Sequence, residues 1–159
     1  MIFVTVGAQM PFNRLVEAVD QWAGETGRED IFAQIGPTDW RPGYIQWTKF
    51  LDSAQFFEKF DAADTIVAHA GMGTILSALV RGKSILVMPR QGSLRETRND
   101  HQVATAKRLL DLGKVEVAFD EKELLEKLQA IDRLKKPSPI GPYASPDLIE
   151  AIQRFVRES

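Results

Sequence analysis

The chain contains no cysteine, only two histidines and almost no net charge. Without cysteine there is no disulfide framework, thiolate metal site or cysteine nucleophile, which fits a cytoplasmic chain. His69 and His101 are too few for a metal site, and no acidic cluster with metal-ligand spacing accompanies them. We therefore expect no metal. A formal net charge of −2 also gives no electrostatic reason to expect nucleic acid.

Long hydrophobic runs are missing as well. No apolar run approaches the ~20 residues needed to span a bilayer. Residues 1–6 open a strand directly and do not resemble a signal peptide. If the protein works at a membrane, something else must hold it there. With 159 residues, 44% of them hydrophobic, the chain is expected to form one ordinary globular domain with a real core.

Along most of the chain, short apolar runs alternate with segments whose apolar residues recur at helical spacing. Buried strands are predicted over residues 2–6, 31–35, 44–48, 65–68, 84–88 and 115–118. This alternation predicts an α/β fold, a Rossmann-like parallel sheet with helices on both faces and right-handed crossovers.

Apolar residues at helical spacing separate these strands. The first predicted helix carries Phe12 to Trp22 and ends at Gly24 and Gly27, and the second carries Phe56 to Phe60 behind a cap at Asp52 or Ser53. Residues 75–80 are apolar on nearly every face and predict a buried helix. Two more helices are expected, one from near Asp100 to Gly113 and one over residues 124–131.

Residues 135–146 break the pattern with four prolines and a glycine. They predict an extended connector, followed by an amphipathic helix over residues 148–156. The chain thus divides into a ligand-binding domain over residues 1–134 and a proline-rich connector with a terminal helix over residues 135–159. Two interpretations of that helix are open, because its apolar face could pack on the domain or lie against a partner.

Residues 65–102 organise the rest of the chain. A strand ends at His69, Gly71 and Gly73 allow a tight turn and close approach of a ligand, and Thr74 opens the next helix. This order places free backbone N–H groups and the positive end of a helix dipole at the carboxyl edge of a sheet, where phosphate binds well. We interpret it as a nucleotide or phosphosugar site, although such glycines are often only turn and packing residues.

A long polar loop follows the strand that Pro89 stops, and loops of that length are often functional. Arg90, Arg95 and Arg98 could clamp phosphate through bidentate hydrogen bonds, or they could belong to a solvated loop that alternates with acidic residues. His69, at a strand end, is more typical of a structural hydrogen-bonding residue than of a general base.

Three motifs in order carry a resemblance to a known family. VTVG with PF shortly after it (residues 4–7 and 11–12), AHAGMGT (68–74) and NDHQVATA (99–106) resemble the C-terminal domain of glycosyltransferase family 28. The match runs to about Leu112. It is closest to the single-domain branch that includes the catalytic subunit of the two-part N-acetylglucosaminyltransferase of dolichol-linked oligosaccharide synthesis, and bacterial exopolysaccharide subunits. The resemblance implies the donor-binding, C-terminal half of a GT-B glycosyltransferase.

The resemblance also implies a set of residues that contact a UDP-sugar. Gly7 and Ala8 would line a phosphate-side turn, Phe50 and Leu51 would lie beside the uracil, and Gln102 would reach the sugar. The diphosphate would be held by the segment Gly71, Met72, Gly73, Thr74, and the same cleft would be flanked by His69, Arg90, Asn99, Asp100 and His101. The chain departs from the family at Ser77, where a glutamate is common, and at Ala8, where serine or threonine is common.

The implied chemistry is inverting transfer from a UDP-sugar to a lipid-linked saccharide, without a metal or other cofactor, in polysaccharide or glycolipid biosynthesis. The general base and the membrane anchor are expected from a partner subunit, which would recruit this cytoplasmic chain to the inner face of the membrane. His69 and His101 are the only weak candidates for a base within this chain. Two alternatives remain, a non-catalytic nucleotide-binding regulatory module, favoured by Ser77, and an assembly domain that keeps only the fold. An apolar face awaiting a partner could also self-associate in the purified chain.

Overall fold

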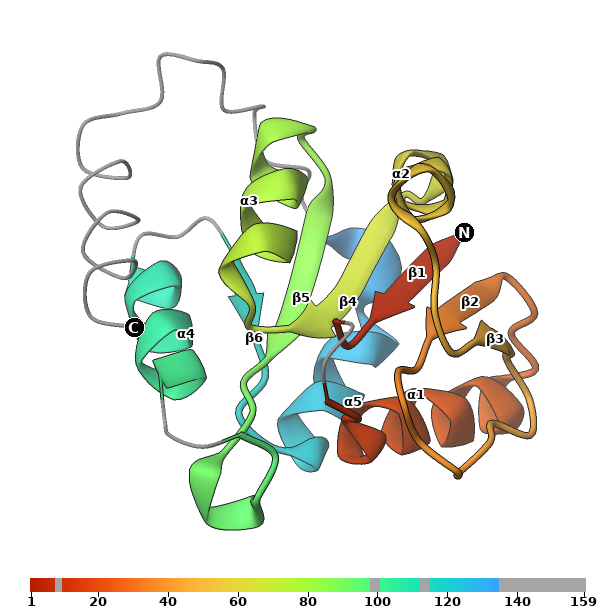
Figure 1. Ribbon diagram of the computed structural model, residues 1–159, viewed down its shortest axis with the longest axis horizontal. Helices are drawn as coiled ribbons and strands as arrows, with labels where there is room; N and C mark the ends of the chain where they lie inside the picture. Colours follow the sequence, from red (N-terminus) through yellow and green to blue (C-terminus); the bar gives the residue numbers. More distant parts are fainter. Residues whose placement is uncertain (8–9, 98–100, 112–114, 135–159) are drawn as a thin grey trace.

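The computed structural model describes residues 1–7, 10–97, 101–111 and 115–134. They form a six-stranded, entirely parallel sheet in the order β3-β2-β1-β4-β5-β6 (Figure 1). The strands are β1 (Ile2–Thr5), β2 (Ile31–Gln34), β3 (Gln46–Thr48), β4 (Thr65–His69), β5 (Ser84–Met88) and β6 (Glu116–Val117). The helices are α1 (Asn13–Thr26), α2 (Ser53–Ala62), α3 (Met72–Val80), α4 (His101–Asp111) and α5 (Glu121–Gln129), with 3-10 turns η1 (Gly92–Leu94) and η2 (Ile131–Arg133).

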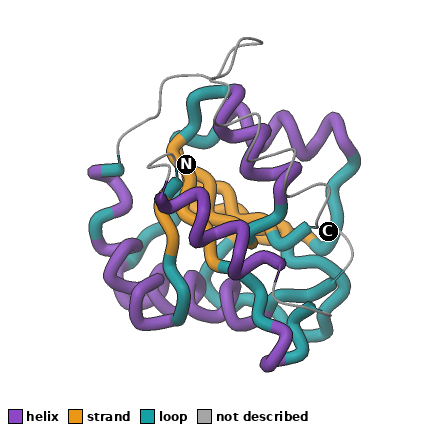
Figure 2. The backbone as a smooth tube through the Cα atoms, turned by 90° about the vertical axis from the view of Figure 1, so that its left-hand side faces the viewer, coloured by secondary structure: helices purple, strands orange, loops and turns teal. Residues whose placement is uncertain are grey.

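Helices cover both faces of the sheet, and the alternation of side chains along each strand explains why (Figure 2). On β5, Leu86 and Met88 pack in one buried cluster with α1 and α5. Ile85 and Val87 point the other way and pack in a second cluster with α2, α3 and α4. A strand buried on both faces has no polar side to show, which is why its sequence is a continuous apolar run. The predicted Rossmann-like α/β fold is confirmed.

The order of the strands creates a topological switch point between β1 and β4. From β1 the chain adds β2 and β3 on one side, and it then returns to place β4 on the other side of β1. Connections at the carboxyl ends of these two strands therefore leave in opposite directions. In open parallel sheets, such a divergence opens a crevice where ligands bind.

Two predicted helix features differ from the structure. The sequence predicts that α1 ends at Gly24 and Gly27; the helix continues past Gly24 to Thr26 and ends at Gly27, which has a left-handed φ of 71°, so the prediction is confirmed at Gly27 and wrong at Gly24. Gly24 lies under the ring of Tyr44, since a Cβ there would be 2.6 Å from ring carbons. The full burial predicted for α3 is also wrong. Its inner face contacts the sheet, but Leu76 and Val80 on its outer face are 37% and 48% exposed.

Other boundaries agree more closely. Asp52 caps α2, and Gln55 completes a capping box with it, as the sequence predicted for that helix start. β3 is shorter than predicted because the N–H groups of Tyr44 and Ile45 donate to the carboxylate of Asp20 and not to β2.

Several predictions fall on residues that the structure does not describe. They concern Ala8, Arg98, Asn99, Asp100, the helix end at Gly113, the connector over residues 135–146 and the helix over residues 148–156. Within the described ranges, no helix combines the length and hydropathy needed to cross a bilayer.

Candidate functional site

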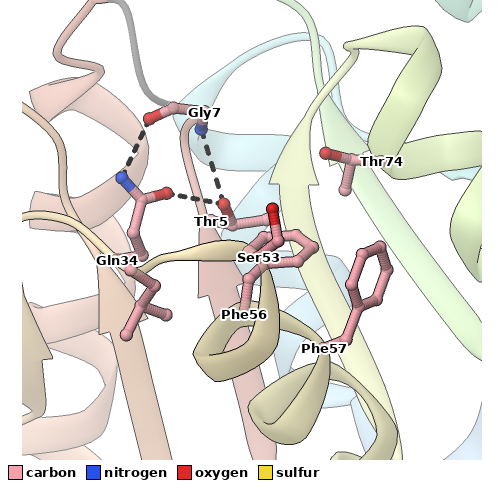
Figure 3. A pocket seen from close by; sticks show the side chains of 8 residues that line it. Thr5, Gly7, Gln34, Ser53, Phe56, Phe57 and Thr74 are labelled. Carbon is pink, nitrogen blue, oxygen red and sulfur yellow. Dashed lines mark hydrogen bonds between the residues drawn. The ribbon is translucent and has the colours of Figure 1, made fainter.

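A buried polar cluster forms the floor of the crevice beside β1. The hydroxyl of Thr5 donates to Oε1 of Gln34 at 2.7 Å, and the N–H of Gly7 donates to the same hydroxyl at 3.4 Å (Figure 3). The amide nitrogen of Gln34 donates to the carbonyls of Gly7 and Lys49, each at 2.9 Å. Gln34 therefore ties the turn after β1 to the connection that leads into α2.

A pocket of about 180 Å³ opens above this floor. Phe56 and Phe57 of α2 form an apolar wall, with their rings edge to face at 5.2 Å, and Thr74 of α3 lies across from them (Figure 3). Leu51 and Ser53 complete the lining. Whole ligand sites usually enclose ~300–1,000 Å³, so this pocket fits one ring of a larger ligand, with polar groups below and aromatic carbon at the side.

The start of α3 offers backbone donors next to the pocket. Gly71 precedes the helix and supplies no side-chain cap, and the first helical hydrogen bond runs from the N–H of Ile75 to the carbonyl of Gly71. Within the described residues, the N–H groups of Met72, Gly73 and Thr74 have no partner. A helix start of this kind binds anions through its free N–H groups and its dipole.

The two glycines at this helix start differ in what surrounds them. A Cβ on Gly71 would lie 2.3 Å from Cε1 of His69, so the imidazole requires a glycine there. A Cβ on Gly73 would meet nothing within 4 Å. Neither has the left-handed φ that favours glycine. The described part of the chain thus explains Gly71 by packing and leaves Gly73 unexplained.

The imidazole of His69 lies partly buried between the turns at Gly7 and Gly71. Its Nδ1 is 3.3 Å from the amide nitrogen of Gln102. Burial, together with the positive charge of Arg90, lowers the pKa of His69 to about 4. The ring is therefore neutral near pH 7. Its surroundings match the structural hydrogen-bonding role that the sequence favoured over a general base.

Arg90 does not have the role that the sequence suggested. Only 4% of its surface is exposed, and its guanidinium donates to the carbonyls of Val6, Met10, Pro11 and Glu96. For Arg90 the phosphate clamp, one of the two interpretations of the loop arginines, is wrong, because backbone carbonyls occupy the donors that a phosphate would need. Burial also lowers the pKa of this guanidinium. For Arg95 the clamp stays a prediction.

The side-chain amide of Gln102 is likewise directed inward. Its Oε1 accepts hydrogen bonds from the N–H groups of Ala70 and Arg90, at 3.2 and 3.0 Å. Gln102 thus joins the ends of β4 and β5 to the start of α4. A contact between Gln102 and a sugar stays a prediction.

The remaining predicted contacts are spread around the carboxyl edge. Phe50 is 53% exposed and its neighbour Leu51 lines the pocket. Met72 is partly buried at the start of α3, and His101 is exposed at the start of α4. The substrate roles of these residues stay predictions, as does any consequence of Ser77, which lies partly buried on α3.

Sequence reasoning did not assign the floor or the aromatic wall of the pocket to the site. Thr5 and Gln34 carried a usable signal, since each is a polar residue at the end of an otherwise apolar strand, where parallel strands present side chains to a ligand. Phe56 and Phe57 gave none, because aromatic residues at helical spacing also fit a core, and both do pack against it.

Comparisons with known proteins identify the fold and the family of this chain. Among solved structures, the NMR structure of ALG13 matches with a TM-score of 0.61 and 21% identity, over 95% of this chain and 94% of that one. MurG from Acinetobacter baumannii matches with a TM-score of 0.63 and 20% identity, over 96% of this chain and 49% of MurG. The glycotransferase of kitacinnamycin matches with a TM-score of 0.58 and 20% identity, over 98% of this chain and 38% of that one.

At these identities the likenesses show the fold, which is that of the C-terminal half of a GT-B glycosyltransferase. The chain spans nearly all of the ALG13 structure but about half of MurG. No curated protein matches its sequence. The model of the glycosyltransferase family 28 C-terminal domain, however, matches residues 1–141. The chain therefore belongs to the glycosyltransferase family 28 C-terminal domain family.

Proposed function

We propose that this chain is the donor-binding subunit of a glycosyltransferase, and that it binds a UDP-sugar in the crevice between the carboxyl ends of β1 and β4. Family membership supports a glycosyltransferase role in general. The nucleotide, the sugar acceptor and the need for a partner subunit are parts of this proposal.

Gly73 is the observation that carries the proposal. Glycine in a helix is less stable than alanine by roughly 0.5–1 kcal/mol, and neither packing nor backbone conformation requires it at this position. A ligand in van der Waals contact with the helix start would explain the glycine, because a side chain at this position would collide with that ligand. The free N–H groups beside Gly73 indicate that the ligand is an anion, which the diphosphate of a nucleotide sugar satisfies.

The neighbouring pocket suits the ring of the nucleotide. Its apolar wall of Phe56 and Phe57 would contact a flat ring, while Thr5, Gln34 and Ser53 offer polar groups to the ring or the ribose. The pocket and the helix start share Thr74, so one ligand could place its ring in the first and its diphosphate at the second.

The same arrangement would assist transfer. When the sugar leaves, negative charge develops on the diphosphate, and preorganised N–H donors at a helix start stabilise such charge without a metal. Deprotonation of the acceptor needs a base within hydrogen-bond reach. The ring of His69 faces Gln102 through Nδ1, so this proposal assigns the base to another chain.

Exposed apolar residues at the rim of the site support contact with a partner subunit. Met10, Phe50 and Leu94 are 37%, 53% and 52% exposed, and they lie in the connections that follow β1, β3 and β5. A membrane-anchored partner that covers this edge would supply the base and a lipid-linked saccharide, and would hold this chain at the inner face of the membrane.

A binding experiment tests the proposal. Calorimetric titration of the purified chain with UDP should show binding that does not require magnesium and that exceeds binding of ADP and GDP. Gly73→Ala should weaken UDP binding about tenfold or more, because one added methyl in a fitted site typically costs ~10–200-fold. Gly43→Ala is the matched control, since its new methyl would make only an ordinary contact with Asp20, away from the crevice.

Transfer activity separates the proposal from its alternatives. The chain together with its partner should transfer sugar from a UDP-sugar. UDP binding without transfer in that complex would favour a regulatory module. A complex that ignores UDP would overturn the proposal and favour an assembly domain.

A further inference from the structure

The orientation of the Gln102 amide follows from its neighbours. One corner of the amide lies 3.2 Å from the N–H of Ala70 and 3.0 Å from the N–H of Arg90. Backbone N–H groups only donate, so the corner that faces two of them must be the carbonyl oxygen. The other corner is therefore the NH₂ group, which can donate hydrogen bonds but cannot accept them.

This orientation decides where the proton of His69 lies. The NH₂ group of Gln102 is 3.3 Å from Nδ1 of His69. Because NH₂ can only donate, Nδ1 must present its lone pair, and a neutral imidazole then carries its hydrogen on Nε2. Protonation of Nδ1 would set two donors against each other, so Gln102 opposes the imidazolium as well.

The protonated nitrogen faces the candidate site. An ideal Cβ would lie 3.2 Å from Nε2 if built on Gly7, and 2.8 Å from it if built on Gly71. The Nε2 edge of the ring thus lies between the two glycine turns. Nothing within the described ranges hydrogen-bonds to it. Arg90 is the charged group that acts on the ring, and its guanidinium is held by backbone carbonyls.

We propose that Gln102 is a positioning residue, which holds His69 as the neutral tautomer with its hydrogen on Nε2. The ring then presents a fixed N–H donor to an oxygen of a ligand bound between the turns at Gly7 and Gly71, and it is not available as a base. Only the identification of that ligand as a nucleotide sugar rests on the function proposed above.

Nitrogen NMR of the imidazole rings tests the tautomer in the ligand-free protein. The chain has only two histidines, and a His101→Gln variant assigns the signals of His69. We expect the Nδ1 resonance at the unprotonated position and the Nε2 resonance at the protonated position throughout pH 5–8. A hydrogen on Nδ1, or a mixture of both tautomers, would overturn the proposal.

Gln102→Glu provides the critical variant. A carboxylate has the same shape and still accepts from Ala70 and Arg90, but it cannot donate to Nδ1 and instead attracts a proton there. We expect His69 to move its hydrogen to Nδ1 or to become imidazolium, with a raised pKa. Gln129→Glu, the same change at an exposed residue of α5, should leave both resonances unchanged. A spectrum of His69 that is identical in Gln102→Glu and wild type would contradict the assignment to Gln102.

Addition of UDP distinguishes this inference from the proposed function. Binding should shift the Nε2–H signal of His69 in the wild-type chain. A chain that has the expected tautomer, with or without its partner, but never responds to UDP would refute the nucleotide-sugar site and still confirm the action of Gln102 on His69. A chain that binds UDP with the hydrogen of His69 on Nδ1 would refute the inference alone.

Discussion

Two turns meet at the switch point, one after β1 and one after β4. They differ in which of their backbone groups form hydrogen bonds within the protein. In the turn after β1, the carbonyls of Val6, Met10 and Pro11 accept hydrogen bonds from Arg90, and the carbonyl of Gly7 accepts one from Gln34. In the turn after β4, Ala70 donates to Gln102, while the N–H groups at the start of α3 have no partner in the described part of the chain.

This difference assigns separate tasks to the two turns. Buried side chains hold the described residues of the first turn by their carbonyls. The second turn keeps its N–H donors available for a ligand, at a point where solvent can satisfy them in the meantime. Substitutions should therefore range from a large loss of stability at Arg90, which holds the first turn, to a small gain at Gly73 in the second, with a loss at Gly71 where the second turn packs against His69.

Arg90→Ala should produce the largest effect. It removes the donors to four backbone carbonyls, of which that of Val6 is buried and the other three are partly buried, and a buried acceptor left unpaired costs about 1–3 kcal/mol. We expect the free energy of unfolding to fall by at least about 3 kcal/mol in urea denaturation, with partial recovery in Arg90→Lys. Arg133→Ala, at an exposed arginine of η2, is the control. A loss below about 1 kcal/mol would show that Arg90 does not hold the first turn.

The second-largest effect should come from acidification, which should lower the free energy of unfolding through His69. The pKa of His69 is lowered to about 4 in the folded chain, against an unfolded value near 6.5. Between these values the unfolded chain binds the proton and the folded chain does not, so stability is complete above pH 6.5 and declines as the pH falls toward 4. From pH 7 to pH 4.5 the loss should be about 2.5 kcal/mol.

The control for this pH effect is His69→Asn, whose side-chain oxygen can accept from Gln102 but does not titrate in this range. Urea denaturation at both pH values should show that the variant lacks the His69 contribution to the loss. Equal losses in the variant and the wild type would assign the effect of acid to other groups.

The fold and the location of the candidate site could be predicted from local patterns, whereas the contacts of individual side chains could not. Apolar strands and amphipathic helices are short-range features, and the AHAGMGT segment marked the carboxyl edge because a strand, a turn and a helix follow one another there. The role of Arg90 depends on carbonyls about 80 residues earlier in the chain. No local pattern distinguishes an arginine that serves such carbonyls from one that binds phosphate.

Gly71 and Gly73 show that local sequence also fails to distinguish roles between residues that are close together in the chain. Gly71 and Gly73 are two residues apart and equivalent in the motif, so the sequence assigned both to the diphosphate. Only the position of the His69 ring separates a glycine needed for packing from one that packing does not require. The sequence likewise named both Gly24 and Gly27 as the end of α1, because the approach of Tyr44 to Gly24 is a tertiary contact that no local pattern reveals.

Gly71→Ala should break the packing of the second turn. Its new methyl would lie 2.3 Å from a ring that Gln102 holds in place, and overpacking of this kind typically costs ~1–3 kcal/mol. Urea denaturation measures the loss, and displaced imidazole resonances of His69 would locate it. An unchanged stability with unchanged resonances would show that the ring can move aside freely.

Gly73→Ala should have the smallest effect on stability, and in the opposite direction. The new methyl meets open space in a helix that begins one residue earlier, so replacing glycine should stabilise the fold by roughly 0.5 kcal/mol. The same variant should bind UDP more weakly than wild type, while Gly43→Ala binds it normally. Urea denaturation and calorimetry on one preparation measure both quantities. A Gly73→Ala chain that is more stable and binds UDP as well as wild type would mean that the glycine serves neither the fold nor a ligand, and the open space at Gly73 would no longer support a donor site.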